Sequence, residues 1–173
     1  MSIEKLKAAI RDVPDFPKKG ILFKDITPVL ADPALFREAV DLFVQRHKGK
    51  GIAKVAAIDA RGFLFGGAVA RELGAGLVPI RKAGKLPYQT FEESYALEYG
   101  TATIALHVDA FRKGEKVLLL DDLLATGGTA LAAANLIRKA GGAVAEVDFL
   151  IELAFLHGRQ KLAAYPVFAP IVF

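Results

Sequence analysis

Cysteine is absent from this chain of 173 residues, and its absence excludes several classes of protein. There is no disulfide framework, no thiolate zinc site and no cysteine nucleophile. Histidine is also scarce: only His47, His107 and His157 occur, at scattered positions, so a histidine-rich metal site is not expected. What remains is a soluble, mildly basic domain that is rich in apolar residues.

Long apolar runs are missing as well. The hydrophobic fraction of 53% excludes intrinsic disorder. However, charged residues such as Arg61, Arg71, Asp121 and Asp122 interrupt the apolar stretches before they reach the ~20 residues that span a bilayer. Residues 1–11 mix charges into their apolar positions and offer no uncharged signal core. We therefore expect a cytoplasmic protein with no membrane partner.

No repeat, low-complexity tract or linker divides the sequence, and its length suits one globular domain. We expect a single domain over residues 1–173, with a leading segment of about residues 1–33 and a core of residues 34–173. The formal net charge is +4, from 23 Lys and Arg against 19 Asp and Glu. This mild excess by itself identifies no partner.

The spacing of apolar residues predicts a helix over residues 3–13, followed by a turn-rich stretch to residue 20. Asp32 is a suitable N-cap and Pro33 a suitable first residue for a second helix, which should end near Gly49.

Beyond residue 50, strands and helices alternate. Apolar strands are predicted at residues 54–59, 76–80, 116–120 and 144–151, and helices at residues 62–73 and about 129–139. Residues 101–108 alternate in polarity, which predicts an antiparallel strand paired with the stretch before Gly100. This order predicts an α/β fold in which helices flank a parallel sheet, with ligands beyond the carboxyl ends of the strands.

The most informative string is residues 117–129, where an apolar strand leads into Asp121 and Asp122 and then into a small-residue loop. That loop consists of Ala125, Thr126, Gly127, Gly128 and Thr129. Glycines let backbone N–H groups turn inward, and the start of a helix adds partial positive charge, so the loop suits a phosphate. The two carboxylates need donors, and sugar hydroxyls are suitable. Alternatively, the acids only cap the next turn.

A basic cluster follows the second predicted strand. Arg81, Lys82 and Lys85 lie within five residues that contain no acid, which suits a polyanion. A solvated basic turn is the alternative reading of these three residues taken alone.

The string from Val117 to Thr129 resembles the phosphoribosyl pyrophosphate signature of the phosphoribosyltransferases. It is neither a Walker A loop nor a dinucleotide fingerprint. Four further segments resemble the adenine phosphoribosyltransferases in the same order, and the similarity continues through residues 150–153 and 158–159. These four segments are residues 16–28, 59–66, 81–87 and 94–100.

The resemblance implies an enzyme of purine salvage. It would transfer the 5-phosphoribosyl group from phosphoribosyl pyrophosphate to N9 of adenine, giving AMP and pyrophosphate. Mg²⁺ would be bound through the diphosphate, with no direct protein ligand. Family members also have a small N-terminal hood, here about residues 1–33, and a flexible antiparallel loop over the site, and they act as homodimers.

The resemblance also assigns roles at the phosphoribosyl pyrophosphate end of the site. Asp121 and Asp122 would hold the ribose hydroxyls, and residues 125–129 the 5′-phosphate. Arg61, Arg81, Lys82 and Lys85 would contact the pyrophosphate. Family members often hold the peptide at the position of Asp59 and Ala60 in cis, but the sequence does not show its state here, and Ala60 stands where serine is common.

At the base end, the resemblance points to two segments. Glu98 would handle the proton by bonding to N7 of the purine, with Arg61 and Tyr99 as further catalytic residues. Leu22, Phe23 and Lys24 would hold adenine through backbone groups and ring stacking, although Phe23 as a core residue is an alternative. Tyr88 stands where the family usually has glycine, which puts the geometry of that loop in question.

Two other functions remain open from the sequence. A related enzyme could use hypoxanthine, guanine, xanthine or orotate instead of adenine. A regulator could bind phosphoribosyl pyrophosphate as a signal, together with RNA or DNA. Because the basic residues are not gathered into one stripe, we expect no nucleic-acid partner.

Overall fold

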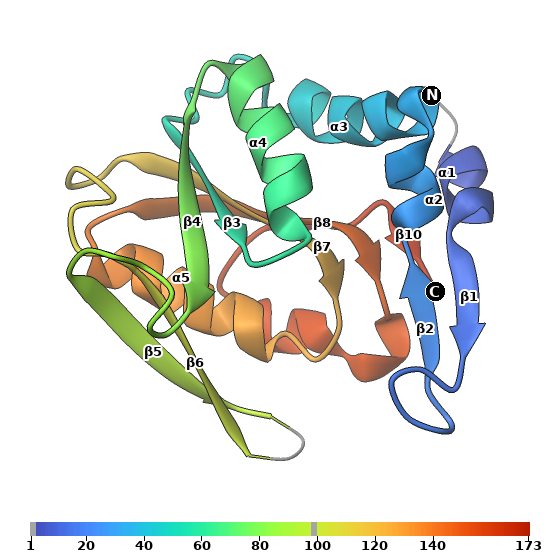
Figure 1. Ribbon diagram of the computed structural model, residues 1–173. Helices are drawn as coiled ribbons and strands as arrows, with labels where there is room; N and C mark the ends of the chain where they lie inside the picture. Colours follow the sequence, from blue (N-terminus) through green and yellow to red (C-terminus); the bar gives the residue numbers. More distant parts are fainter. Residues whose placement is uncertain (1–2, 98–99) are drawn as a thin grey trace.

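The structure is a computed structural model that describes residues 3–97 and 100–173. Its main sheet comprises β3 (Lys54–Ile58), β4 (Gly76–Lys82), β5 (Thr90–Ala96), β6 (Thr101–His107), β7 (Lys116–Leu124), β8 (Ala143–Glu152), β9 (Val167–Phe168) and β10 (Ile171–Val172). The strand order is β10-β8-β7-β3-β4-β6-β5, with β9 beside β8 (Figure 1). Strands β4, β3, β7 and β8 run parallel, and β6 is antiparallel to β4 and β5. The predicted α/β fold is confirmed.

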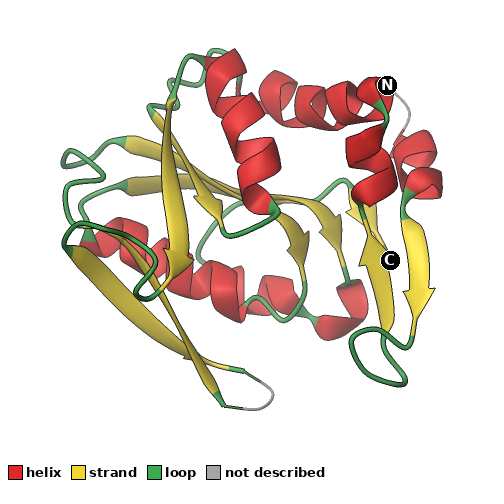
Figure 2. Ribbon diagram, in the orientation of Figure 1, coloured by secondary structure: helices red, strands yellow, loops and turns green. Residues whose placement is uncertain are grey.

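Helices cover both faces of this sheet (Figure 2). Helices α3 (Pro33–His47) and α4 (Gly62–Leu73) lie on one face, and α5 (Gly128–Lys139) lies on the other. Alternation along β7 explains the two cores: Leu118 and Leu120 join the cluster under α3 and α4, whereas Val117 and Leu119 join the cluster under α5. A strand buried on both faces reads as a continuous apolar run, as β7 does at residues 117–120.

The predicted helix ends are confirmed where they depend on local chemistry. The Asp32 carboxylate accepts hydrogen bonds from the backbone N–H groups of Ala34 and Leu35, at 2.8 and 3.0 Å, and so caps α3. Gly74 ends α4 with φ +65°, a conformation that glycine adopts without steric cost.

The leading segment differs from the prediction. It contains α1 (Ile3–Ala9), β1 (Arg11–Pro14), β2 (Leu22–Asp25) and α2 (Thr27–Ala31). The helix predicted to reach residue 13 was wrong beyond residue 9, because β1 pairs antiparallel with β2, with Val13 opposite Phe23. Pairing with a distant segment has overridden the local helical spacing. The boundary at residue 33 stays a prediction.

Strand β7 is longer than predicted and contains the acid pair. Its pairing with β8 continues past residue 120, with Asp121 opposite Phe149 and Leu123 opposite Ile151. The two-residue strands β9 and β10 and the 3-10 helices η1 (Ala154–Leu156) and η2 (Gly158–Leu162) were not predicted either.

Two antiparallel hairpins, β1–β2 and β5–β6, extend toward the lower part of Figure 1, on either side of the molecule. The β5–β6 hairpin confirms the predicted pairing across residue 100, with Ala96 opposite Thr101. Across residues 3–97 and 100–173, no helix combines the length and apolar character needed to cross a bilayer.

Candidate active site

A pocket opens where the parallel strands β3 and β7 end. Since β3 pairs with both β4 and β7, residues that follow these strands meet at one edge of the sheet. The pocket is lined by Ile58, Asp59, Ala60, Arg61, Tyr95, Asp121, Asp122 and Thr129. The acid pair, the segment after β3 and one loop threonine are therefore brought together, as the sequence predicted. The Asp59–Ala60 peptide, whose state the sequence left open, is cis.

Arg61 links the acid pair to the N-terminal hairpin. Its Nε donates to Oδ2 of Asp122 at 2.5 Å, and its guanidinium carbon lies 5.3 Å from the centre of the Phe23 ring. Asp122 is only 4% exposed, whereas the Arg61 side chain is 43% exposed. Arg61 thus satisfies a buried carboxylate and keeps donors free for an anionic ligand, because a guanidinium carries five N–H groups.

Gly62 sits directly against the acid pair. A Cβ at this position would lie 2.9 Å from Oδ1 of Asp121 and 3.1 Å from the carbonyl oxygen of Leu120. The start of α4 can therefore approach β7 this closely only because residue 62 has no side chain. This close approach helps to place Arg61 beside Asp122.

The basic cluster at the end of β4 divides into two parts. Arg81 lies beside Asp59, with its Nε donating to Oδ2 at 3.1 Å, and its Nη1 donates to the carbonyl of Lys85. Arg81 thus joins the group of charges at the sheet edge. Lys82, the last residue of β4, and Lys85, just beyond this strand, are exposed and do not line the pocket. Their predicted contact with pyrophosphate stays a prediction.

The loop between β7 and α5 forms a second, adjoining pocket. It is lined by Asp121, Leu123, Leu124, Ala125, Thr126, Gly127, Gly128, Thr129, Ala130 and Phe149. Gly127 has φ +78°, and a Cβ there would clash with the carbonyl oxygen of Gly158. The loop opens directly into the first turn of α5, whose N–H groups and dipole favour an anion. All five predicted phosphate-loop residues line this pocket.

The two carboxylates are electrostatically unequal. Burial raises the pKa of Asp121 well above its usual value, and repulsion from the neighbouring Asp122 raises this pKa further. The Asp121 Oδ1 accepts a hydrogen bond from the backbone N–H of Asp122 at 2.8 Å. Asp121 therefore ionises less readily than an ordinary carboxyl group, while Asp122 faces the Arg61 cation.

The three residues predicted to bind adenine lie in different environments. Leu22 is 49% exposed and Phe23 is half-buried, with its ring 5.1 Å from that of Phe16 in an edge-to-face arrangement. Lys24 is buried, and its Nζ donates to Asp12 and lies 3.9 Å from the ring centre of Phe173. The Lys24 side chain is thus engaged within the fold, while Phe23, near Arg61, is not in either core cluster.

Tyr95 on β5 is a site residue that the sequence analysis did not single out. Its hydroxyl lies 3.0 Å from Oγ1 of Thr129, so the β5–β6 hairpin contacts the phosphate loop directly. In the sequence, the one indication that Tyr95 belongs to the site was its position within residues 94–100, a segment that resembles the family. Glu98 and Tyr99, the predicted catalytic residues of this hairpin, lie outside the described residues. Asp59, which pairs with Arg81, was likewise quoted only as part of a motif.

Tyr88 does not force an unusual backbone. It is absent from the non-glycine residues with positive φ, which in the described part of the chain are Asp15 and His157. The residue is 57% exposed, and its ring meets that of His107 edge to face, at 6.0 Å between ring centres. Tyr88 therefore rests on the neighbouring β6.

Comparison with known proteins agrees with this geometry. Residues 25–168 match the family described as "Phosphoribosyl transferase domain". An adenine phosphoribosyltransferase from Geotalea daltonii is 53% identical over 171 residues, covering 99% of this chain and all of the relative.

Solved structures give the same result. Adenine phosphoribosyltransferase from Thermoanaerobacter pseudethanolicus superposes with a TM-score of 0.96 at 49% identity, covering 99% of this chain and 100% of the other. The Saccharomyces cerevisiae enzyme, in complex with adenine and an imino-altritol bisphosphate, gives a TM-score of 0.93 at 39% identity over 98% of both chains.

A more distant structure, from Trypanosoma brucei, is in complex with AMP, pyrophosphate and ribose-5-phosphate. It gives a TM-score of 0.89 at 28% identity, covering 98% of this chain and 78% of the other. Sequence, fold and site geometry thus agree, and this chain belongs to the adenine phosphoribosyltransferases of the phosphoribosyl transferase family.

Proposed function

We propose that this protein transfers the 5-phosphoribosyl group of phosphoribosyl pyrophosphate to N9 of adenine, releasing AMP and pyrophosphate. The observation that carries the proposal is the position of Arg61, which pairs with Asp122 beside the phosphate loop and faces Phe23 of the hood. Groups suited to ribose, phosphate and an aromatic base therefore adjoin one another. The relatives that crystallised with adenine, AMP and pyrophosphate support the same assignment.

The reaction exchanges one bond to ribose carbon C1 for another. The bond from C1 to the diphosphate oxygen breaks, and its electron pair leaves with the diphosphate. A bond forms from N9 of the base, whose imidazole ring gives up one proton. Positive charge therefore develops on the ribose while negative charge collects on the leaving group, so groups of opposite sign are needed at the two ends.

The described residues provide both the negative groups needed near the ribose and the positive groups needed near the diphosphate. Asp121 and Asp122 line the pocket at the position assigned to ribose, where carboxylates can accept hydroxyl protons and stabilise positive charge. Arg61 and Arg81, each paired with one carboxylate of the sheet edge, supply cations for the diphosphate. Residues 125–129 and the start of α5 would hold the 5′-phosphate.

The proton at the base is assigned to Glu98, with Tyr99 assisting closure of the hairpin. Both assignments stay predictions from the family resemblance. The hydrogen bond from Thr129 to Tyr95 supports the idea that this hairpin and the phosphate loop act together. Closure of the hairpin would exclude water, which could otherwise react at C1.

The pocket fits Mg²⁺ as an accompanying ion, because the side chains at its edge include carboxylates, and Mg²⁺ prefers oxygen ligands. Arg81 and Arg61 already occupy one oxygen each of Asp59 and Asp122. We therefore expect the diphosphate to supply most of the ligands. When bound, the ion would neutralise charge on the leaving diphosphate.

A homodimer and a cytoplasmic location also stay predictions.

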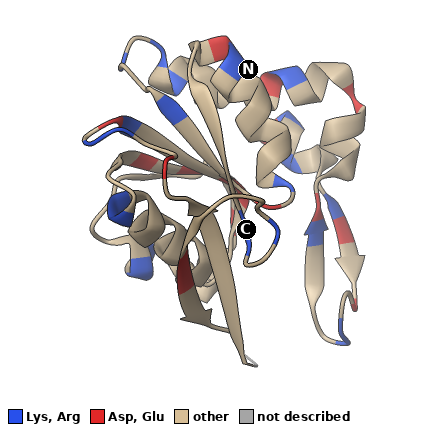
Figure 3. Ribbon diagram, turned by 60° about the vertical axis from the view of Figure 1, so that its left-hand side comes forward, with Lys and Arg blue, Asp and Glu red and all other residues tan. Residues whose placement is uncertain are grey.

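The alternative function, a regulator that binds phosphoribosyl pyrophosphate together with RNA or DNA, has less support. In the described part of the chain, Lys and Arg are spread over many elements in the view of Figure 3, whereas nucleic-acid-binding domains typically gather them on one face. An enzyme for another base is the closer alternative, because backbone groups at Leu22 and Lys24 would tolerate changes in side chain. Only the choice of base distinguishes that alternative from the proposal.

The test is to supply the protein with phosphoribosyl pyrophosphate, Mg²⁺ and one base at a time, and to measure nucleotide formation by chromatography. Adenine should give AMP and stoichiometric pyrophosphate. Hypoxanthine, guanine, xanthine and orotate should be much poorer substrates. Absence of AMP, or equal use of hypoxanthine, would contradict the proposal.

A further inference from the structure

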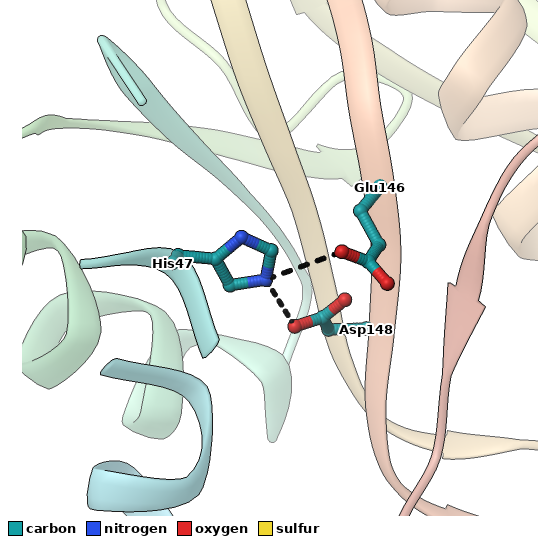
Figure 4. A group of neighbouring side chains, drawn as sticks. All are labelled: His47, Glu146 and Asp148. Atoms are coloured by element: carbon teal, nitrogen blue, oxygen red, sulfur yellow. Dashed lines mark hydrogen bonds and ion pairs between the residues drawn. The ribbon is translucent and has the colours of Figure 1, made fainter. Parts of the chain in front are cut away.

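A buried polar cluster lies apart from the active site, between α3 and β8 (Figure 4). It consists of His47 at the end of α3 and of Glu146 and Asp148 on β8, which are 2%, 6% and 0% exposed. Because Glu146 and Asp148 are two residues apart on a strand, both side chains point to the α3 face of the sheet. None of the three lines either pocket of the active site.

The geometry of the cluster leaves oxygen atoms free. A 2.7 Å hydrogen bond joins Nε2 of His47 to Oδ2 of Asp148, and Oε2 of Glu146 lies 3.9 Å from the same nitrogen. Nε and Nη2 of Arg46 both donate to the other Glu146 oxygen, Oε1, so Arg46 orients the carboxylate with Oε2 toward His47. Arg46 itself packs over the Phe168 ring at 4.3 Å.

The Asp148 carboxylate is only partly satisfied by hydrogen bonds. Its second oxygen, Oδ1, is buried and has no hydrogen-bond partner. In Figure 4 this carboxylate is directed toward both His47 and Glu146. An unpaired buried carboxylate oxygen is costly, and buried charges in proteins are normally paired or coordinate a metal. The two carboxylates of the cluster thus face one guanidinium group, that of Arg46, and one imidazole, that of His47.

We propose that His47, Glu146 and Asp148 form a binding site for one divalent transition-metal ion. One ligand atom from each residue can be chosen so that all three lie within 4.8 Å of one another, as a shared ion requires. One imidazole nitrogen with two carboxylate oxygens suits Zn²⁺, Mn²⁺ or Co²⁺ better than Mg²⁺, which prefers oxygen alone. Coordination needs the Nε2 lone pair, so any proton on Nε2 moves to Nδ1 or to solvent.

The surface offers a route to the cluster. A groove at the end of α3 is lined by His47, Lys48, Gly49, Gly51, Ile52, Glu72 and Leu73. His47 is thus the point at which the buried cluster meets the groove. A bound ion would tie the end of α3 to β8, whose partner residues stand about 100 positions away in the sequence, and would therefore stabilise the fold.

The experiment measures binding of Zn²⁺, Mn²⁺ and Co²⁺ to the chelator-treated full chain, without phosphoribosyl pyrophosphate, by calorimetry and thermal denaturation. We expect one ion per chain and a rise in Tm of at least about 5 °C at a free metal concentration near 100 times Kd. Co²⁺ should also give visible absorption bands.

Variants locate the ion. Asp148→Asn and His47→Gln should each weaken binding at least about 10-fold and remove the Tm shift. His107→Gln and His157→Asn, which change the other two histidines, should bind as the wild type does. Circular dichroism of each metal-free variant establishes that it is folded, and Glu146→Gln replaces any variant that is not.

Three outcomes would overturn the proposal. The first is no stoichiometric binding of any of the three ions, which would leave the cluster as an ion pair. The second is binding that survives in both Asp148→Asn and His47→Gln. The third is binding lost in Asp122→Asn but retained in Asp148→Asn, which would place the ion in the active site.

Discussion

Asp121 and Asp122 are adjacent in the sequence but meet different surroundings in the fold. Asp122 is held by Arg61, whereas Asp121 is partly buried at the pocket, with its charged neighbour as its main electrostatic contact. The pKa of Asp121 is raised by both effects. A carboxyl whose folded pKa is raised stabilises the fold at low pH, and this contribution is lost as the pH rises above its unfolded value. At neutral pH, the Asp121 carboxyl group therefore lowers the free energy of unfolding.

The first prediction concerns this cost. Asp121→Asn removes the charge but keeps an oxygen that can accept from the Asp122 N–H group. We expect Tm at pH 7 to rise by about 2–4 °C, the shift that ~1 kcal/mol gives in a chain of this size, while activity falls. The exposed Asp109→Asn is the matched control and should change neither quantity. An unchanged or lower Tm would show that the Asp121 charge is already well stabilised.

The second prediction at this scale concerns Glu98. Glu98→Gln should lower kcat by about 10²-fold or more, the usual contribution of general acid or base catalysis. The apparent affinity for phosphoribosyl pyrophosphate should change little, since the predicted contact of Glu98 is with the base. Steady-state kinetics with each substrate varied tests this, with Glu92→Gln on the exposed side of the same hairpin as control. A normal kcat would remove Glu98 from the mechanism.

At the scale of elements, the β1–β2 hairpin is held by a charged contact as well as by its ladder. Arg11 donates to Asp25 at 2.7 Å, directly across the two strands. The Asp25 carboxylate also accepts from the backbone N–H of Thr27 at 2.9 Å. The Thr27 N–H, followed by Arg11, lowers the pKa of Asp25 from 3.8 to about 2.

The third prediction follows from that shift. A carboxyl with a lowered folded pKa stabilises the protein above its unfolded pKa and loses this contribution as the pH falls through the folded value. The difference in Tm between the wild type and Asp25→Asn should therefore be largest above pH 4 and shrink toward pH 2. Thermal denaturation of both proteins from pH 2 to 6 measures it. A difference that stays constant over this range would contradict the assignment.

On the scale of the whole molecule, some apolar surface is left uncovered. Leu64 on α4 is 48% exposed and Leu77 on β4 is 45% exposed. Leu77 packs beside α4, because a Cβ at Gly66 of this helix would lie 3.4 Å from Leu77 Cδ1. Exposed apolar groups on neighbouring elements are typical of interaction surfaces when they form one patch.

The fourth prediction is that the protein is a dimer in solution. Sedimentation equilibrium should give about 37 kDa, twice the chain mass of 18.5 kDa. Leu77→Lys should shift the equilibrium toward the monomer if this face is shared, while Val172→Lys, at another exposed apolar position, should not. A mass of one chain at micromolar concentration would contradict the prediction.

Features encoded within a few consecutive residues could be predicted from the sequence. The string from the β7 strand through the acid pair to Thr129 is continuous, so its phosphate loop was visible without the fold. The Asp32 cap and the Gly74 helix end are equally local. Each depends on backbone conformation and on hydrogen bonds within a few residues, which the sequence specifies directly.

Contacts between distant segments were decided only by the tertiary structure. Helical spacing predicted a helix to residue 13, but pairing with β2 made residues 11–14 a strand. The contact of Arg61 with Asp122 joins positions 61 residues apart, and that of His47 with Asp148 joins positions 101 apart. Such contacts depend on strand order, register and packing across the whole sheet. The sequence thus determined the chemical groups and the local turns, and the fold determined which of those groups meet.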